Sequence, residues 1–276
     1  MRRATGVAPQ FSILFNIMVR QLPLVCSTEV FQFADDLTNS TSANDPNQLS
    51  AKLQDNYSKI KAFCSNIGLE INLNKTQLII FKSAAKKLPP NFVISLDNVP
   101  ISPSQTVKLL GVTLDQHFTM GSHIDGVVKK CHGLLGMLRR STAYLPRELL
   151  NLVYTSVIRS HLEYCSGTFF NAAPTHLNKL DVVQKIASRI ITGSSPQAHS
   201  APLQLQLGLD LLQSRRKIHV VSLVIDILRG QSHPYLIELF QSSAMSNCTT
   251  IPNNKLAIRG SLGLELKSTT NISAAL

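Results

Sequence analysis

The sequence predicts an α+β fold in which a mixed part of strands and helices is followed by an all-helical part. Strand-like runs fall before residue 115, whereas after it apolar residues recur every three or four positions. This segregation favours an α+β domain joined to a helical bundle over alternating βαβ units. We therefore predict one domain over residues 1–115, helices over 116–242 and a loose polar tail over 243–276.

The first part is predicted to contain one long helix and several short strands. A strand-like run over residues 30–34 ends at the acidic pair Asp35-Asp36. Asp45-Pro46 predicts a helix start, because an aspartate oxygen caps free backbone amides and proline suits the first turn. The apolar repeat that follows ends at Gly68, and glycine commonly terminates helices. Further strands are predicted over residues 76–81, 92–96 and 106–114.

The second part is predicted to be four helices. Ser122 can cap the first, whose apolar stripe predicts a buried face made of Ile124, Val127, Val128, Cys131, Leu134, Leu135 and Leu138. The other helices are predicted over residues 147–164, 177–192 and 214–229. The apolar run 218–228 is too short to span a bilayer and contains two polar residues, so it predicts a buried helix.

Charge and cysteine usage restrict the partners and the compartment. With 27 Lys and Arg against 16 Asp and Glu, the net charge is +11, which favours nucleic acid or an anionic membrane surface. A solvated basic surface without a partner is the alternative. The five cysteines include no C-x-x-C pair, which argues against a zinc site or a disulfide framework. With no signal peptide or transmembrane segment recognised, we predict an intracellular protein of the cytoplasm or nucleus without a membrane partner.

Asp35 and Asp36 are the residues whose pattern points most directly to chemistry. Two adjacent carboxylates repel each other unless a cation compensates their charge. Oxygen ligands of this kind suit Mg²⁺, the usual ion where phosphates react. Such a site supports two-metal phosphoryl transfer, in which one ion activates a 3′-hydroxyl and the other steadies the departing pyrophosphate. The alternative is an exposed acidic turn that binds nothing.

Several short segments follow one another in a recognisable order. They are Phe33-Ala34-Asp35-Asp36, Gly68 to Thr76, Val107 to Asp115, Leu162-Glu163-Tyr164-Cys165, and Leu209 to His219 with its Arg215-Arg216-Lys217. In this order, over about residues 5 to 240, they resemble the reverse transcriptases of non-LTR (LINE, jockey-like) retrotransposons. The resemblance implies an RNA-directed DNA polymerase with a partial palm of antiparallel strands and packed helices, followed by an all-helical thumb. It also implies that the acidic pair lies at the bend of a two-stranded hairpin backed by the helix over 45–68.

The resemblance further implies roles for individual residues. Asp35 would be a direct ligand of Mg²⁺, with Asp36 beside it. Lys75 would lie near the incoming triphosphate, where an ammonium can neutralise or protonate the leaving pyrophosphate; the alternative is a solvated lysine. Gly111 would belong to a hairpin that grips the primer, where a missing side chain lets a sugar-phosphate approach; the alternative is a strand bulge. Gln10 would belong to a segment close to the template.

Two departures from the family pattern predict that the chain is inactive as it stands. The family needs a third carboxylate on an earlier palm strand, but Asp35 is the first aspartate and Glu29 the only earlier acid. Because affinity for divalent ions follows the number and placement of oxygen ligands, we expect weak Mg²⁺ binding. Residues 5–17 also resemble a damaged Gly-Val-Pro-Gln-Gly-Ser segment, in which Ala8 is additional and Phe11 replaces a glycine. The alternative is that these residues form a plain apolar segment.

Four basic residues, Lys129, Lys130, Arg139 and Arg140, project away from the apolar stripe of the helix that begins near Ser122. They could follow a phosphate backbone without reading its sequence, and the resemblance implies an RNA template and a DNA primer as partners. Ordinary solvation of an amphipathic helix is the alternative. Three hypotheses remain: an inactive fragment of an RNA-directed DNA polymerase, a basic non-specific nucleic-acid-binding module, and a non-functional relic.

Overall fold

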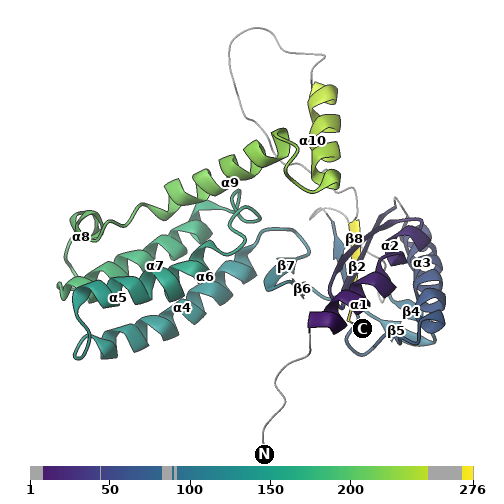
Figure 1. Cartoon of the computed structure of the whole chain (residues 1–276), viewed down its shortest axis with the longest axis horizontal. Helices are drawn as coiled ribbons and strands as arrows, with labels where there is room; N and C mark the ends of the chain where they lie inside the picture. The colour runs from purple at the N-terminus through teal and green to yellow at the C-terminus, as the bar shows by residue number, and fades with distance from the viewer. Residues whose placement is uncertain (1–8, 44, 83–88, 90–91, 248–268, 276) are drawn as a thin grey trace, which may run out of the picture. The chain divides into compact units, whose positions relative to one another are not determined.

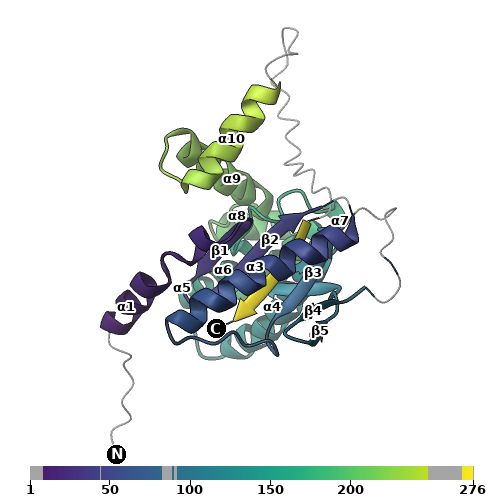
Figure 2. The ribbon, with the colours of Figure 1, turned by 90° about the vertical axis from the view of Figure 1, so that its right-hand side faces the viewer.

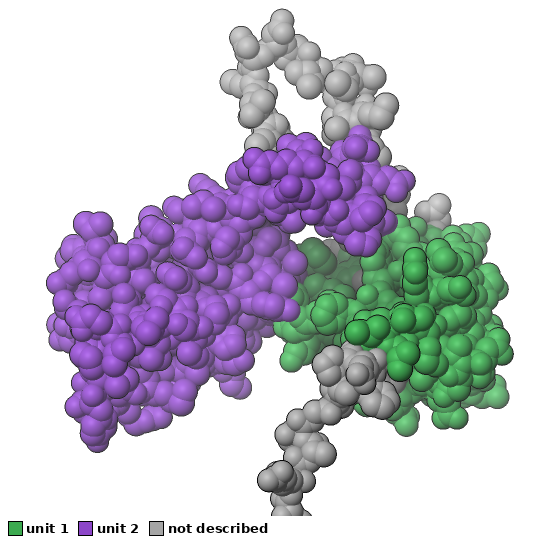
Figure 3. Space-filling model, viewed as in Figure 1, with its two compact units in different colours: residues 1–118, 261–276 green, residues 119–260 purple. Residues whose placement is uncertain are grey.

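The computed structural model describes residues 9–43, 45–82, 89, 92–247 and 269–275 (Figure 1). The chain divides into two compact units, which Figure 3 colours separately. Unit 1 comprises residues up to Phe118 together with the segment from Ser261, and unit 2 comprises Thr119–Gly260. All described strands belong to unit 1, and the regular elements described in unit 2 are helical. The mixed helix-and-strand character predicted from the sequence is therefore confirmed.

Unit 1 is built on a four-stranded sheet with the strand order β1-β2-β8-β3. The strands are β1 (Glu29–Phe33), β2 (Asp36–Ser42), β3 (Gln77–Phe81) and β8 (Thr269–Ala275). Because β8 is antiparallel to both β2 and β3, these two strands run parallel to each other. The segment predicted to be a loose tail thus contributes a strand. Its residues, Thr-Thr-Asn-Ile-Ser-Ala-Ala, lack the alternation of polar and apolar residues that identifies a strand in a sequence.

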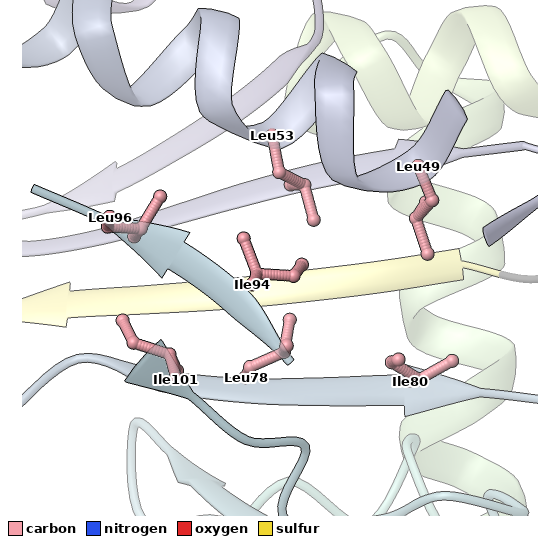
Figure 4. Close-up of a cluster of buried hydrophobic side chains, with 7 residues drawn as sticks. All are labelled: Leu49, Leu53, Leu78, Ile80, Ile94, Leu96 and Ile101. Atoms are coloured by element: carbon pink, nitrogen blue, oxygen red, sulfur yellow. The ribbon is translucent and has the colours of Figure 1, made fainter. Parts of the chain in front are cut away.

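Helix α3 (Pro46–Asn66) crosses one face of this sheet (Figure 2). The Asp45 carboxylate caps it as predicted, accepting hydrogen bonds from the amides of Asn47 at 3.0 Å and Gln48 at 3.2 Å. On the sheet side, Leu49 and Leu53 point into an apolar cluster with residues of β3 and of the short strands β4 (Ile94–Leu96) and β5 (Val99–Ile101) (Figure 4). The predicted long helix is confirmed, and its buried face holds it to the sheet.

The single strand predicted over residues 106–114 is wrong, because these residues form a hairpin. Strands β6 (Thr106–Leu109) and β7 (Val112–Asp115) are joined by Leu110-Gly111, whose φ angles are 45° and 85°. Two consecutive positive φ angles are what a tight two-residue hairpin turn requires. The hairpin packs on β3 through a cluster of Ile79, Phe81, Val107 and Leu114. Two helices, α1 (Pro9–Val19) and α2 (Leu22–Val25), precede β1.

Unit 2 begins with α4 (Gly121–Ser141), whose predicted buried stripe is confirmed at Ile124, Cys131, Leu135 and Leu138. The predicted helix over 147–164 is observed as α5 (Arg147–Val153) and α6 (Arg159–Glu163), separated by a π-helical turn over Tyr154–Ile158. The remaining helices are α7 (Pro174–Thr192), α8 (Ser200–Gln206), α9 (Leu212–Leu228) and α10 (Pro234–Asn247). In Figure 1, α4, α5, α6 and α7 lie side by side.

Candidate functional site

The acidic pair lies at the bend of the β1–β2 hairpin. The register places Phe33 opposite Asp36, so Ala34 and Asp35 form the whole turn. Ala34 has a φ of 53°. A residue with a side chain pays about 1–2 kcal/mol to adopt this left-handed conformation, which glycine adopts freely. The hairpin backed by α3 that the resemblance implied is confirmed, and its turn is strained where the two carboxylates meet.

Apolar and polar contacts with α2 and α3 hold the hairpin in place. Leu37, which follows the acidic pair on β2, is buried in a cluster with Leu22, Ile60 and Cys64. The fully buried Asn56 of α3 accepts a hydrogen bond from the Ser27 amide at 3.2 Å and donates one to Thr28. The Thr28 hydroxyl in turn donates to Asn39 of β2 at 2.6 Å. Because buried polar groups of this kind are costly to leave unpaired, the network fixes both strands to α3.

The two carboxylates are open to ligands. Asp35 is exposed and Asp36 is half-buried. Neither forms an ion pair with a basic residue of the described chain. On the same face, Phe31 and Phe33 of β1 are 42% and 65% exposed. The bend and the two phenylalanines are therefore accessible, and the acidic pair has no compensating ion pair among the described residues.

The donor set partly fits a magnesium ion. Both side chains offer oxygen ligands, and Mg²⁺ is often held by only one or two carboxylates, with waters and substrate phosphates completing the octahedron. Within the described residues, however, no group of three or more His, Cys, Asp or Glu side chains is arranged to hold a metal ion. Asp35 and Asp36 could thus anchor an ion that a substrate completes, but they do not form a full protein cage.

Lys75 is exposed and lies just before β3, in a turn where the Asn72 carbonyl accepts a hydrogen bond from its amide at 3.1 Å. The strand register shows how this turn relates to the carboxylates. On β8, Ala275 is opposite Asp36 and Ser273 is opposite Gln77. The segment that leads into β3 therefore lies at the end of the sheet where Asp36 lies. Asp36 and this segment are separated by two strand spacings, about 10 Å. The structure therefore places Lys75 at the same end of the sheet as the acidic pair.

Gly111 and Gln10 lie elsewhere in unit 1. Gly111 is the second residue of the β6–β7 turn, so its positive φ explains the glycine, and the alternative of a strand bulge is wrong. The tip of this hairpin is exposed, as a contact with a ligand backbone would need. Gln10 lies in the first turn of α1, and the structure describes the backbone of this residue only.

The four basic residues of α4 are all exposed, and none pairs with an acidic residue in the described part of the chain. They do not form one stripe. With 100° per residue, Lys129 and Arg140 lie on the side opposite the buried residues, whereas Lys130 and Arg139 lie on opposite flanks. Lys129 and Arg140 are about 16 Å apart along the axis at 1.5 Å per residue. The helix therefore presents positive charge over most of its exposed circumference.

Two segments that carried the resemblance meet inside unit 2. Arg215 of α9 donates two hydrogen bonds to the Glu163 carboxylate, which raises the pKa of the guanidinium. Ser166 lies 3.0 Å from His219 Nδ1. The next arginine, Arg216, is 3% exposed and donates to Asp181 of α7 at 3.1 Å. No sequence pattern indicates these pairings, which assign the two arginines to internal packing, unlike the exposed basic residues of α4.

Comparison with known proteins shows which family part of the chain resembles. Residues 8–114 match the family model described as "Reverse transcriptase (RNA-dependent DNA polymerase)". This match contains the β1–β2 hairpin, α3, β3 and most of the β6–β7 hairpin, so the similarity to a reverse transcriptase domain falls within unit 1. No solved structure matches the chain significantly. In the described residues, no helix is long and apolar enough to cross a membrane.

Three proteins similar to the chain come from mobile elements. The chain is 27% identical over 193 residues to "Probable RNA-directed DNA polymerase from transposon BS" of Drosophila melanogaster, which covers 68% of this chain and 21% of that protein. It is 27% identical over 208 residues to "RNA-directed DNA polymerase from mobile element jockey" of the same organism, covering 69% and 22%. A retrotransposable element R1 polyprotein of Nasonia vitripennis is 24% identical over 167 residues, covering 58% and 43%.

These findings confirm the resemblance to jockey-like non-LTR reverse transcriptases. The chain is similar to part of these retrotransposon RNA-directed DNA polymerases, and it spans about a fifth of the length of the first two.

Proposed function

We propose that this chain is the part of a retrotransposon RNA-directed DNA polymerase that carries the carboxylate hairpin, with unit 1 as a palm piece and unit 2 as the thumb. One observation carries the proposal: Asp35 and Asp36 stand at the bend of a hairpin backed by α3, inside the segment that matches the reverse transcriptase family. The proposed partners are an RNA template and a DNA primer, and the proposed cofactor is Mg²⁺.

The proposed chemistry uses the residues at one edge of the sheet. Asp35 and Asp36 would hold Mg²⁺, and the ion would supply Lewis-acid chemistry that favours loss of the primer 3′-hydroxyl proton and stabilises charge on the pyrophosphate. Asp35, at the exposed tip, can reach toward the reacting phosphate, while Asp36 is held in place by the β2 ladder. Lys75, at the same edge, neutralises or protonates the leaving pyrophosphate.

The proposed nucleic-acid contacts come from three elements. The turn at Gly111 lets a sugar-phosphate approach the β6–β7 backbone, and Gln10 of α1 contacts the template. On α4, Lys129, Lys130, Arg139 and Arg140 bind phosphates. Contacts of this kind position a duplex without selecting its sequence.

By itself, this chain is proposed not to extend a primer. The described residues offer two carboxylates at the hairpin, and a weakly held ion cannot support the reaction at a useful rate. A primer-extension assay on an RNA template, with Mg²⁺ or Mn²⁺, tests this. We expect no incorporation from either the natural chain or Asp35→Asn. Synthesis that depends on Asp35 would overturn the inactive state while supporting the site, and synthesis that survives Asp35→Asn would remove Asp35 from the reaction.

A second candidate function, non-specific binding of nucleic acid, is favoured by the exposed cations of α4. Fluorescence anisotropy with a labelled RNA–DNA hybrid between 50 and 200 mM salt (on the order of physiological ionic strength) measures it. Replacing the four basic residues with glutamine should weaken binding and reduce the salt slope by about 0.7–0.9 for each phosphate that the variant no longer neutralises. Lys179→Gln is the matched control, because that lysine is already paired with Asp125 at 2.6 Å. Salt-insensitive binding, or an equal effect per charge from the control, would contradict the proposal.

A further inference from the structure

One face of α9 carries a row of exposed apolar side chains. The opposite face is the buried one: it contains Leu212, Arg216 and Ile227, and Arg216 reaches α7 through Asp181. At 100° per residue, four residues lie on the side away from it and are between 39% and 71% exposed, namely Ile218, Val221, Ile225 and Leu228. We call these four residues the outer seam. Single exposed apolar residues are common, but four on one helix face form a continuous apolar surface.

The spacing of the outer seam is that of a helix-pairing surface. Its residues follow one another at intervals of three, four and three positions. This alternation is the a and d pattern of the heptad repeat, in which apolar side chains of one helix insert between those of another. Leu211, one heptad before Ile218, is the exposed N-cap residue of α9 and extends the pattern. A second α-helix is therefore the element that fits this surface.

The outer seam ends at a small apolar cavity between α9 and α10, where the chain turns away from the axis of α9 (Figure 1). The cavity has a volume of about 130 Å³, and Ile227, Leu228, Ile237 and Phe240 are among the residues that line it. Apolar cavities of about 150 Å³ can hold a benzene molecule. This cavity can therefore receive one large apolar side chain from a docked helix, and buried anchors of this kind contribute much of the binding energy at interfaces.

The charges beside the outer seam determine which kind of helix it suits. In the same heptad register, the flanking e and g positions are occupied by Arg215, Lys217, Ser222, Val224 and Arg229. Three of these residues are basic and none is acidic. Arg215 is paired with Glu163, so the exposed Lys217 and Arg229 provide the available charge. Since charges at e and g positions select the partner of a helix, acidic residues on the docked helix complement this surface.

The helices described in this chain do not provide such a partner. Each of them contains at most one acidic residue, such as Asp226 of α9 or Glu238 of α10. A second copy of α9 likewise offers no acidic residue at the flanking positions. The complementary charge must therefore come from another polypeptide.

We propose that the outer seam of α9 is a docking site for an acidic amphipathic helix of a separate protein. The docked helix carries apolar residues at its a and d positions, Glu or Asp at e and g, and one large apolar side chain that enters the cavity beside α10. Laying the apolar face of such a helix on an apolar surface is a common mode of peptide recognition. The site lies within unit 2 and uses none of the residues proposed for metal binding or phosphoryl transfer.

Binding of a synthetic helix to the full chain tests the outer seam. The probe is a fluorescein-labelled peptide of about three heptads with Ile at a, Leu at d and Glu at e and g; the control peptide has Lys at e and g. Fluorescence anisotropy should show saturable binding of the Glu peptide, at least about tenfold tighter than that of the Lys peptide. Equal affinities for the two peptides, or no binding of either, would overturn the proposal.

The double variant Val221→Gln with Ile225→Gln should weaken binding of the Glu peptide at least about tenfold. Both residues are exposed, so the variant should keep the circular dichroism melt of the natural chain. Leu205→Gln, at an exposed apolar residue of α8, is the matched control and should leave the affinity unchanged. If the control weakens binding as much as the double variant, the peptide does not bind at the outer seam.

Charge reversal tests the acidic character of the partner. Lys217→Glu with Arg229→Glu should reverse the preference, so that the Lys peptide becomes the tighter ligand. Lys52→Glu with Lys108→Glu makes the same change in net charge at exposed lysines of unit 1 and should preserve the preference for the Glu peptide. A reversal by both pairs, or by neither, would show that the flanks of the outer seam do not select the partner.

Sedimentation velocity distinguishes a second copy from a separate partner. We expect the natural chain and the Val221→Gln, Ile225→Gln variant to sediment alike. Dimers of the natural chain that this variant dissociates would show that a second copy occupies the outer seam, which would contradict the proposal.

Discussion

The two units use their charged residues in opposite ways. In unit 1, Asp35 and Asp36 stand at an exposed, strained bend with no ion-pair partner among the described residues. In unit 2, Arg215 and Arg216 reach inward to Glu163 and Asp181, and the second pair is largely buried. Charges that hold a fold together are paired inside it, since an unpaired buried charge is costly. Charges left uncompensated on a strained turn are instead available to a ligand.

Two of the tight hairpins of unit 1, β1–β2 and β6–β7, differ in the residues at their turns. The β6–β7 turn places glycine at its most positive φ, 85°, as its geometry demands. The β1–β2 turn forces alanine to a φ of 53° and follows it with two acids. Both turns hold a residue with a side chain at a positive φ, Leu110 at 45° and Ala34 at 53°, so the two acids distinguish the β1–β2 turn from the other.

The largest expected effect is the difference in stability cost between breaking a buried ion pair in unit 2 and removing an accessible carboxylate in unit 1. Asp181→Asn should destabilise unit 2 by about 3–5 kcal/mol, because it leaves Arg216 buried without a counter-charge. Asp36→Asn should change stability by less than about 0.5 kcal/mol, since it removes an accessible carboxylate. Urea denaturation followed by circular dichroism measures both. The pair Arg216→Met with Asp181→Leu should recover most of the loss, and equal costs for Asp181→Asn and Asp36→Asn would erase the contrast.

Gly111→Ala should destabilise unit 1 by about 1–2 kcal/mol, because alanine must adopt the left-handed conformation that glycine adopts freely. Thermal denaturation of the full chain provides the measurement. Gly133→Ala is the matched control: that glycine lies inside α4 with open space around it, so alanine should stabilise the helix there. A stabilising effect at Gly111 would show that the turn is not constrained as described.

Ala34→Gly should stabilise unit 1, and by less than Gly111→Ala destabilises it. Removing the side chain relieves the strain at a φ of 53°, and we expect a gain of about 0.5–1 kcal/mol after the entropy cost of glycine. Ala62→Gly, in the exposed part of α3, should instead cost about 1 kcal/mol. If both substitutions destabilise equally in the same denaturation assay, the acidic turn is not strained.

The smallest effect concerns pH. His123 is 5% exposed and packs against Phe169 with ring centroids 5.6 Å apart, and burial lowers its pKa from the ordinary value near 6.5. The neutral ring is therefore favoured by folding, so its contribution is complete above the ordinary pKa and is lost as pH falls toward the lowered one. The melting temperature of unit 2 should decrease between about pH 7 and pH 5. His123→Leu should flatten this dependence; the part that survives is expected from His161, whose pKa burial also lowers.

The sequence predicts well those elements whose signals are local. Asp45 and Gly68 mark the ends of α3, and the apolar period between them predicts its buried face, as found. The order of short motifs around Asp35-Asp36 predicts the hairpin and the similarity to reverse transcriptases, and both are confirmed. These features depend on residues close together in the chain, so no tertiary information is needed to recognise them.

Features that depend on distant partners escape sequence analysis. Residues 269–275 have no strand pattern, and their strand is defined by β2 and β3, more than 180 positions earlier by residue number. Arginine is usually a surface residue, yet the fold buries Arg216 against Asp181. The Leu110-Gly111 turn interrupts residues 106–114, whose apolar residues otherwise predict one continuous strand. In the first two cases the deciding interaction is made only once the chain has folded, whereas the third is a local turn within the hairpin.

Metal binding at the hairpin tests the central claim most directly. Mn²⁺ titrated into the full chain and followed by electron paramagnetic resonance should show a weak site that Asp35→Asn, alone or with Asp36→Asn, weakens at least about tenfold. Asp55→Asn, which alters an exposed acid of α3 paired with Lys59, should leave that affinity unchanged. Mn²⁺ binding that is insensitive to Asp35→Asn and Asp36→Asn, or that Asp55→Asn reduces as strongly, would contradict the assignment of a metal site to this turn.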